Sequence, residues 1–93
     1  MPRYIIERDI PAIGSSDREQ LRGAAAQSNA VLNAMQAEGK AIQWEHTYVV
    51  QDKTFCVYLA DHEASVHEHA RLSGFPASRV TEVRTVISPM TAA

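Results

Sequence analysis

The sequence lacks the features that mark secreted, membrane-spanning or disulfide-stabilised proteins. Its 93 residues include a single cysteine, Cys56, so no disulfide can form within the chain. No run approaches the roughly 18 apolar residues of a membrane span. Charged residues interrupt the first eight positions, where a signal peptide needs a continuous apolar stretch. These absences predict a cytoplasmic protein without a membrane partner.

Concentrated positive charge is also missing. Nine Lys and Arg residues stand against eleven Asp and Glu residues, which gives a net charge of -2, and no basic cluster interrupts the mixture. Binding to a phosphate backbone needs such a cluster, so we expect no nucleic-acid partner. No Ser or Cys stands in a recognisable triad with a His and an acid. We therefore assign no catalytic residue and favour a binding protein over an enzyme.

Bulky apolar side chains are few. Alanine supplies 14 residues, whereas Val, Ile, Leu, Met, Phe and Trp together supply only 24. A chain of this length forms one domain, over residues 1–93, and so few bulky residues give that domain a thin core. We expect a second copy of the chain to cover one more apolar face, which predicts a homodimer.

Gly, Pro and polar clusters divide the chain into six predicted elements. Strands are predicted from β-branched and aromatic residues, and helices from apolar spacings of three and four. The predicted strands are residues 4–8, 42–50, 54–60 and 79–87, and the helices lie between residues 16 and 39 and over 62–73. The order βαββαβ predicts a ferredoxin-like α+β sandwich, a four-stranded antiparallel sheet with two helices on one face. The homodimer is expected to form through the open face.

Capping residues set the expected helix limits. Ser16 and Glu19 form a capping box at the start of the first helix. Asp61 is expected to be the N-cap of the second helix. Gly39 and Gly74 supply the two helix ends.

Side chains that can bind a metal gather in the second half of the sequence. His46 and Cys56 are the first candidate ligands, Glu45 is a candidate carboxylate, and His69 is a further candidate. No spacing matches a zinc-finger, HExxH or EF-hand pattern, so these assignments depend on composition and position. Imidazole, carboxylate and thiolate together suit Ni(II), Cu(II) or Zn(II).

The turn between the second and third strands decides which of these side chains meet. A two-residue turn puts on one face Trp44, His46, Tyr48, Phe55, Val57 and Leu59. That face would be covered by the helices, His46 could meet His69, and the open face would hold Glu45, Cys56 and Tyr58. A three-residue turn would instead gather His46, Cys56 and Tyr58. The cleaner apolar face favours the two-residue turn.

A small-molecule pocket is the alternative to a metal site, because ferredoxin-like dimers often enclose one. Its expected lining residues are Trp44, His46, Tyr48 and Tyr58, with the imidazole as a general base. Glu7 and Glu82 stand at strand centres, where a carboxylate needs either a ligand-binding site or an ion pair across the strands. Both interpretations of these two residues stay open.

Five segments between residues 2 and 89 also carry a family resemblance. They are Tyr4-Ile5-Ile6-Glu7-Arg8, Trp44-Glu45-His46-Thr47-Tyr48-Val49, Asp52-Lys53-Thr54-Phe55-Cys56-Val57-Tyr58, His69-Ala70 with Gly74-Phe75-Pro76, and Thr81-Glu82-Val83. In order and spacing they resemble a family of small bacterial proteins, classified as a domain of unknown function, that includes a nickel-binding protein. The resemblance implies a ferredoxin-like dimer that binds nickel or a related divalent metal. We therefore predict a non-enzymatic homodimer that buffers or senses nickel.

Overall fold

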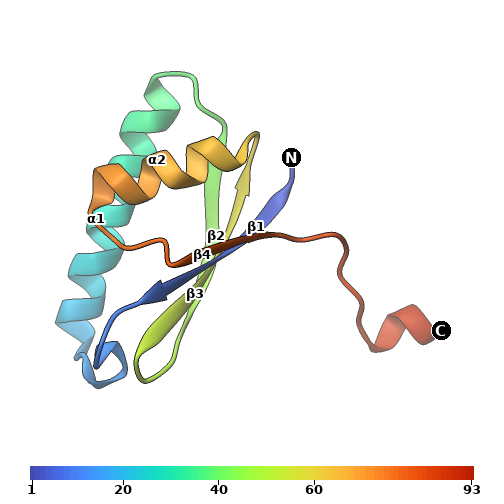
Figure 1. The fold of residues 1–93 in the computed structure, drawn as a ribbon, viewed down its shortest axis with the longest axis horizontal. Coiled ribbons are helices and arrows are strands. Elements are labelled where there is room, and N and C mark those ends of the chain that lie inside the picture. Colours follow the sequence, from blue (N-terminus) through green and yellow to red (C-terminus); the bar gives the residue numbers. More distant parts are fainter.

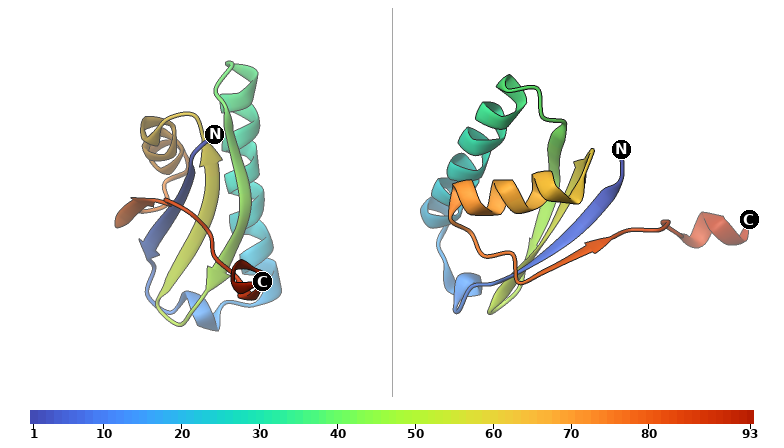
Figure 2. Two further views of the ribbon diagram at one scale, coloured as in Figure 1. Left: turned by 90° about the vertical axis from the view of Figure 1, so that its right-hand side faces the viewer. Right: turned by 45° about the horizontal axis from the view of Figure 1, so that its top comes forward.

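A computed structural model describes all 93 residues and arranges them as a sheet with two helices (Figure 1). The elements are β1 (Arg3–Asp9), η1 (Ile13–Ser15), α1 (Arg18–Ala37), β2 (Ile42–Val49), β3 (Lys53–Ala60), α2 (Glu63–Ser73), β4 (Arg79–Glu82) and η2 (Pro89–Ala92). All strand pairs are antiparallel, in the order β2-β3-β1-β4. Both helices cover one face of this sheet, as the two views of Figure 2 show. The predicted ferredoxin-like α+β sandwich is confirmed.

Helix α1 begins one residue later than its predicted capping box. Asp17 is the N-cap, and its carboxylate accepts a hydrogen bond from the Gln20 amide at 2.8 Å while the Gln20 side chain accepts one from the Asp17 amide at 3.0 Å. The prediction of Ser16 and Glu19 was wrong because the following Asp-x-x-Gln pair satisfies the same free amides.

No helix in the structure is both long and apolar enough to cross a membrane.

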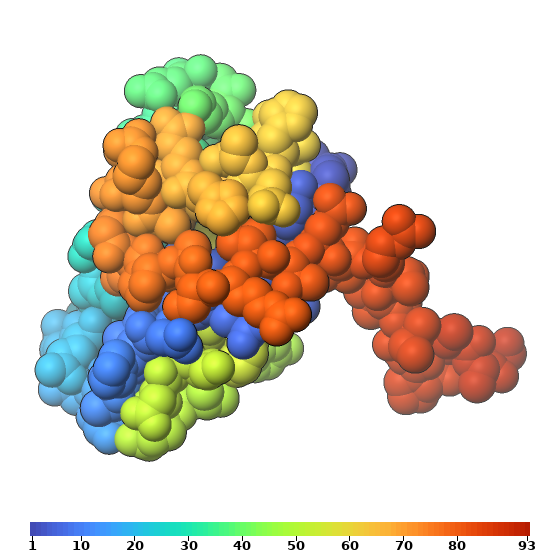
Figure 3. Space-filling view, viewed as in Figure 1, coloured from blue at the N-terminus to red at the C-terminus, as the bar shows by residue number.

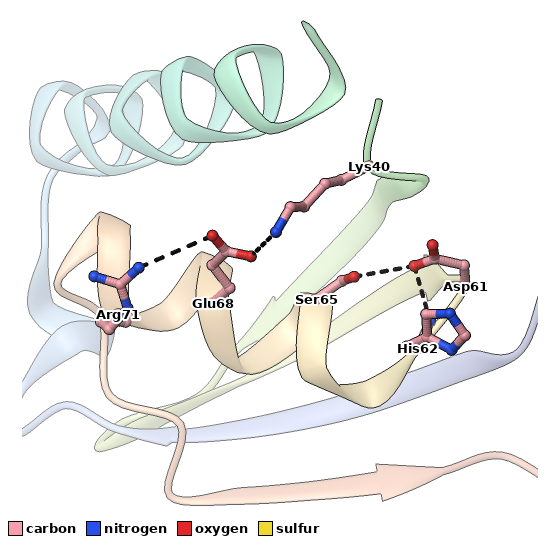
Figure 4. Close-up of polar contacts among 6 residues, drawn as sticks. All are labelled: Lys40, Asp61, His62, Ser65, Glu68 and Arg71. Carbon is pink, nitrogen blue, oxygen red and sulfur yellow. Dashed lines mark hydrogen bonds and ion pairs between the residues drawn. The ribbon is translucent and has the colours of Figure 1, made fainter. Parts of the chain in front are cut away.

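Helix α2 has polar contacts at its start and at its middle (Figure 4). Its N-cap is His62 rather than Asp61. The Asp61 carboxylate lies just before the helix, where it accepts hydrogen bonds from the His62 amide and the Ser65 hydroxyl. Further along, Glu68 pairs with Lys40 from the loop after α1. This ion pair ties the second helix to the end of the first.

The β2-β3 hairpin has the predicted two-residue turn. The Val50 amide donates to the Lys53 carbonyl oxygen at 3.1 Å, which leaves Gln51 and Asp52 as the turn residues. Next to this turn, the amide of Gly14 in η1 donates to the Gln51 carbonyl at 2.9 Å. A Cβ at Gly14 would lie 2.7 Å from two backbone atoms, so this contact requires glycine.

The faces of the hairpin are the reverse of our expectation. β3 turns Cys56 and Tyr58 toward the helices, where both are buried, and Phe55 toward the open face. The reason lies in β1, which pairs Ile6 with Cys56 and Tyr4 with Tyr58. Residues paired across strands share a face, so β3 must follow β1. From the hairpin sequence alone, we assigned the more apolar face to the side covered by the helices. That assignment was wrong because the face that packs against the helices also holds polar side chains.

The core lies between this inner face and the helices. Its central cluster contains Tyr4, Ile6, Leu32, Met35, Ile42, Cys56, Tyr58, Ala60 and Val66. Helix α1 reaches the cluster through one apolar face, of which Leu32 and Met35 are the most deeply buried bulky residues. Toward the start of α1 the inward positions include the small residues Ala24, Ala25 and Ser28, which fill little of the space above the sheet.

The chain beyond β4 leaves the body of the protein. β4 ends at Glu82 rather than at the predicted residue 87, and a final backbone bond of 2.8 Å joins the Val83 amide to the Arg3 carbonyl. Residues 84–93, the C-terminal arm, then project outward (Figures 1 and 3). The radius of gyration is 14.0 Å, against about 12 Å for a compact domain of this length. Val86 and Ile87 in the arm are 68% and 76% exposed.

Candidate functional site

A β-bulge in β2 determines where the candidate metal ligands point. Trp44 pairs with Tyr58 and His46 pairs with Val57, so Glu45 is an extra residue without a partner on β3. Side chains normally alternate between the faces of a strand, and a bulge suspends that alternation for one residue. Glu45 and His46 therefore both face the open side of the sheet, while Trp44 turns toward the helices.

The open face contains a shallow groove of about 620 Å³ around these two side chains. Its lining comprises Arg3, Ile5, Glu45, His46, Tyr48, Val57, Val83, Thr85 and Val86. The Glu45 carboxylate accepts a charge-assisted hydrogen bond from the Arg3 guanidinium at 2.7 Å. The exposed His46 ring meets the Tyr48 ring edge to face, with 5.0 Å between centroids. An imidazole and a carboxylate thus share one accessible surface.

The other two predicted ligands lie in the interior. The Cys56 sulfur accepts a hydrogen bond from Arg8 Nε at 3.4 Å. His69 is 1% exposed, and its Nε2 lies 3.2 Å from the Ser28 hydroxyl. The expected contact between His46 and His69 is wrong because the sheet separates the two rings.

Burial favours the uncharged forms of both His69 and Tyr58. Desolvation, the largest cause, lowers the pKa of His69, and the nearby Arg8 charge lowers it further. Desolvation raises the pKa of Tyr58. The two rings contact each other with 5.3 Å between centroids. A neutral His69 is suited to packing and hydrogen bonding beside Tyr58.

The predicted ligands consequently form two separate pairs. Glu45 and His46 lie on the open face, and Cys56 and His69 lie under the helices. Nowhere in the chain do three or more His, Cys, Asp or Glu side chains gather closely enough to hold a metal ion. One copy of the chain therefore contains no complete metal site.

The two strand-centre carboxylates have different surroundings. Glu7 forms ion pairs with Lys53 at 3.6 Å and with Arg79 at 4.0 Å, as the cross-strand interpretation predicts. Glu82 lies opposite Tyr4 in the register of β1 and β4, so it is on the other face of the sheet from Glu7. The pKa of Tyr4 is raised first by burial and then by the Glu82 carboxylate. The two carboxylates do not share a site.

A second hollow of about 500 Å³ lies between the sheet and α1. Trp44 and Tyr58 line it, as the pocket alternative expected, but His46 and Tyr48 belong to the open-face groove. The prediction of one pocket lined by all four was wrong for two reasons. The hairpin register places Tyr58 on the face opposite His46 and Tyr48, and the bulge at Glu45 turns Trp44 to the side of Tyr58.

Arg8 is the functional candidate that the sequence interpretation did not single out. It points from β1 into the interior pocket and is 2% exposed. The alternation of Tyr4, Ile6 and Arg8 was the available signal, because two buried residues on one face place the third beside them.

The fold and the two hollows define a ferredoxin-like α+β domain with a candidate ligand site on each face of its sheet. Residues 4–83 match the family described as "Nickel responsive protein SCO4226-like", and the chain belongs to this family. The family resemblance predicted from the five segments is confirmed.

A solved structure supports the same fold. The crystal structure of SCO4226 from Streptomyces coelicolor A3(2) superposes with a TM-score of 0.73 at 15% sequence identity, covering 91% of this chain and 99% of that chain. At this identity the similarity concerns the fold alone. No curated protein matches the sequence.

Proposed function

We propose that the protein is a nickel-responsive, non-enzymatic homodimer whose metal site forms where the open faces of two copies meet. The observation that carries this proposal is the bulge at Glu45, which places a carboxylate beside the His46 imidazole in an open groove. Glu45 and His46 of both copies would hold the ion. Nitrogen and oxygen ligands of this kind suit Ni(II), Cu(II) and Zn(II). The description of the family favours nickel among them.

Two copies are needed because one chain presents only two adjacent ligands. Protein sites for transition metals commonly use three or four protein ligands. In a two-fold dimer the same surface of each subunit meets at the axis, so every ligand on that surface is doubled. The proposal therefore predicts one metal ion for each pair of chains.

The apolar character of the open face supports a second copy as its occupant. Ile5 and Tyr48 on this face are 36% and 62% exposed. The C-terminal arm adds Val86, which lines the edge of the groove, and Ile87 and Met90, which are each 76% exposed. An arm with exposed apolar side chains can pack on a neighbouring copy and add the burial that a thin core lacks.

Calorimetric titration of the untagged protein with Ni(II) tests the metal site. We expect one ion per two chains and at least tenfold weaker binding by the His46→Ala variant. His67→Ala is the matched control, because His67 is an exposed imidazole on α2, paired with Glu63 at 3.1 Å. Its affinity should equal that of the unchanged protein. Binding no tighter than roughly 0.1 mM, about 5.5 kcal/mol, or equal binding by His46→Ala, would contradict the proposal.

Sedimentation at micromolar concentration tests the dimer. Tyr48→Glu places a charge on the exposed part of the open face and should give monomers with unchanged circular dichroism. Leu72→Glu is the control, because Leu72 is a comparably exposed apolar residue on α2, away from that face. A monomeric unchanged protein, or equal dissociation in both variants, would show that the open face is not the interface.

A further inference from the structure

Arg8 is a buried cation without a counter-ion. Its Nη1 donates to the Pro76 carbonyl at 2.9 Å, and its Nε donates to the Cys56 sulfur at 3.4 Å. Its Nη2 is buried and has no partner, and no carboxylate lies within ion-pair distance of the guanidinium. Arginine remains protonated in proteins, so this charge cannot be relieved by losing a proton.

The guanidinium lies in the wall of the interior pocket. Arg8 is the one charged residue among the lining side chains. The rings of Tyr58 and Phe75 lie 6.0 and 5.9 Å from its central carbon, and the other polar groups that line the pocket are uncharged. A buried charge in such surroundings is costly unless an anion pairs with it.

The pocket has the size and composition of a small-molecule site. Its volume of about 500 Å³ falls within the range of about 300 to 1,000 Å³ that is usual for ligand pockets. Small residues create the space, namely Ala24 and Ala25 on α1 and Thr54 and Cys56 on β3. The pocket is open to solvent on one side, and an accessible apolar hollow of this size beside a buried charge is the usual setting of a ligand site.

We propose that this interior pocket binds a small organic acid, with its carboxylate on the Arg8 guanidinium and its apolar body against Leu21, Trp44 and Phe75. The proposal goes beyond the metal function and does not depend on it, because this pocket and the open-face groove lie on opposite sides of the sheet. A carboxylate fits better than a phosphate, since one arginine balances a single negative charge and no second cation lines the pocket.

The fluorescence of Trp44 gives a direct measurement of binding. Trp44 is the only tryptophan in the sequence and it lines the pocket. We would titrate metal-free protein with octanoate and with octanamide, a neutral molecule of the same shape, and follow tryptophan emission. Octanoate should saturate with a dissociation constant below about 1 mM, and octanamide should bind at least tenfold more weakly. Equal affinities, no saturation, or tighter binding of octyl phosphate would overturn the proposal.

Substitutions separate charge recognition from apolar binding. Arg8→Met should reduce octanoate affinity at least tenfold, to that of octanamide. Arg22→Met is the control, because Arg22 is exposed on α1 and pairs with Glu19, and it should leave octanoate binding unchanged. Unchanged binding by a folded Arg8→Met protein would overturn the proposal.

A second variant covers the case in which Arg8→Met does not fold. Ala25→Phe fills the pocket from α1 while Arg8 is kept, so the buried charge is not disturbed. It should lose octanoate binding by at least tenfold and keep a native circular dichroism spectrum. Retention of octanoate affinity by this variant would also overturn the proposal.

Discussion

Polar side chains on the two sides of the sheet have opposite surroundings. On the outer face, Glu7 and Glu45 have charged partners within 4.0 Å, and water screens these pairs. Between the inner face and the helices, Arg8 Nη2 from β1 and His69 Nδ1 from α2 are buried without partners. Exposed pairs contribute little to stability, whereas unpaired buried polar atoms cost free energy. The polar side chains that the fold constrains most strongly therefore lie under the helices.

Apolar side chains are distributed in a complementary way. Small residues of α1 and β3 leave a pocket between the inner face and α1, while the outer face leaves Ile5 and Tyr48 exposed. The inner face therefore has unfilled volume, and the outer face has unburied area. A small molecule would fill the volume on the inner side, and a second chain would bury the apolar area on the outer side.

Neighbouring isoleucines on β1 give the largest expected contrast between the faces. Ile6 is fully buried in the core, and Ile5 points to the open face. Ile6→Ala should lower the free energy of unfolding by about 2 to 5 kcal/mol, and Ile5→Ala by about 1 kcal/mol or less. Urea denaturation in the Tyr48→Glu background would measure both without a contribution from dimerisation. Equal losses of unfolding free energy in the two variants would mean that, within one chain, the two faces of the sheet are buried to the same extent.

The contact between η1 and the hairpin turn gives the next effect. Gly14→Ala would force a Cβ to within 2.7 Å of backbone atoms of Gln51 and Val50, which should cost about 1 to 3 kcal/mol. Gly23→Ala is the matched control, because nothing lies within 4 Å of its added Cβ on the exposed side of α1. It should raise stability by about 0.5 to 1 kcal/mol. Thermal unfolding of both variants would compare them, and a neutral Gly14→Ala would show that the turn can move.

Acid should destabilise the inner face through His69. Burial lowers its pKa in the folded protein below the ordinary value of 6.5. At a pH between these two values the unfolded chain binds a proton that the folded chain does not, so stability rises with pH there. Stability is therefore complete above pH 6.5 and is progressively lost as the pH falls toward the folded-state pKa.

A pair of histidine variants isolates this effect. His69→Gln should flatten the dependence of unfolding free energy on pH below 6.5, whatever its own effect at neutral pH. His67→Gln changes an exposed imidazole on α2 and should leave the slope unchanged. A slope that persists in His69→Gln would assign the acid sensitivity to other groups.

The element order and the helix ends could be predicted because each depends on local sequence. The two-residue turn was also predicted correctly, but from the expectation that its apolar face lies under the helices, and that expectation was wrong. Glycines at residues 39 and 74 end the helices with positive φ, as their type suggested. The face of the hairpin could not be predicted in the same way. It is set by long-range pairing with β1, where Ile6 meets Cys56, and the hairpin pattern itself contained apolar residues on both sides.

The candidate site was harder to predict for a related reason. A bulge inserts one residue without any change in composition, so nothing around Glu45 indicated that it would share a face with His46. Arg8 was overlooked because an arginine in a strand is usually exposed, and only its register with Tyr4 and Ile6 places it inside.

The smallest expected effect concerns the ion pair that occupies one candidate metal ligand. Arg3 Nε lies 2.7 Å from Glu45 Oε1, and a metal ion would have to compete with the guanidinium for that carboxylate. Exposed pairs of this kind contribute about 0.2 to 1 kcal/mol, so Arg3→Gln should tighten Ni(II) binding by up to about fivefold. Arg79→Gln, which loosens the Glu7 pair on the same face, should leave the affinity unchanged. Weaker binding by Arg3→Gln in calorimetry would mean that Arg3 positions Glu45 for the ion instead of competing with it.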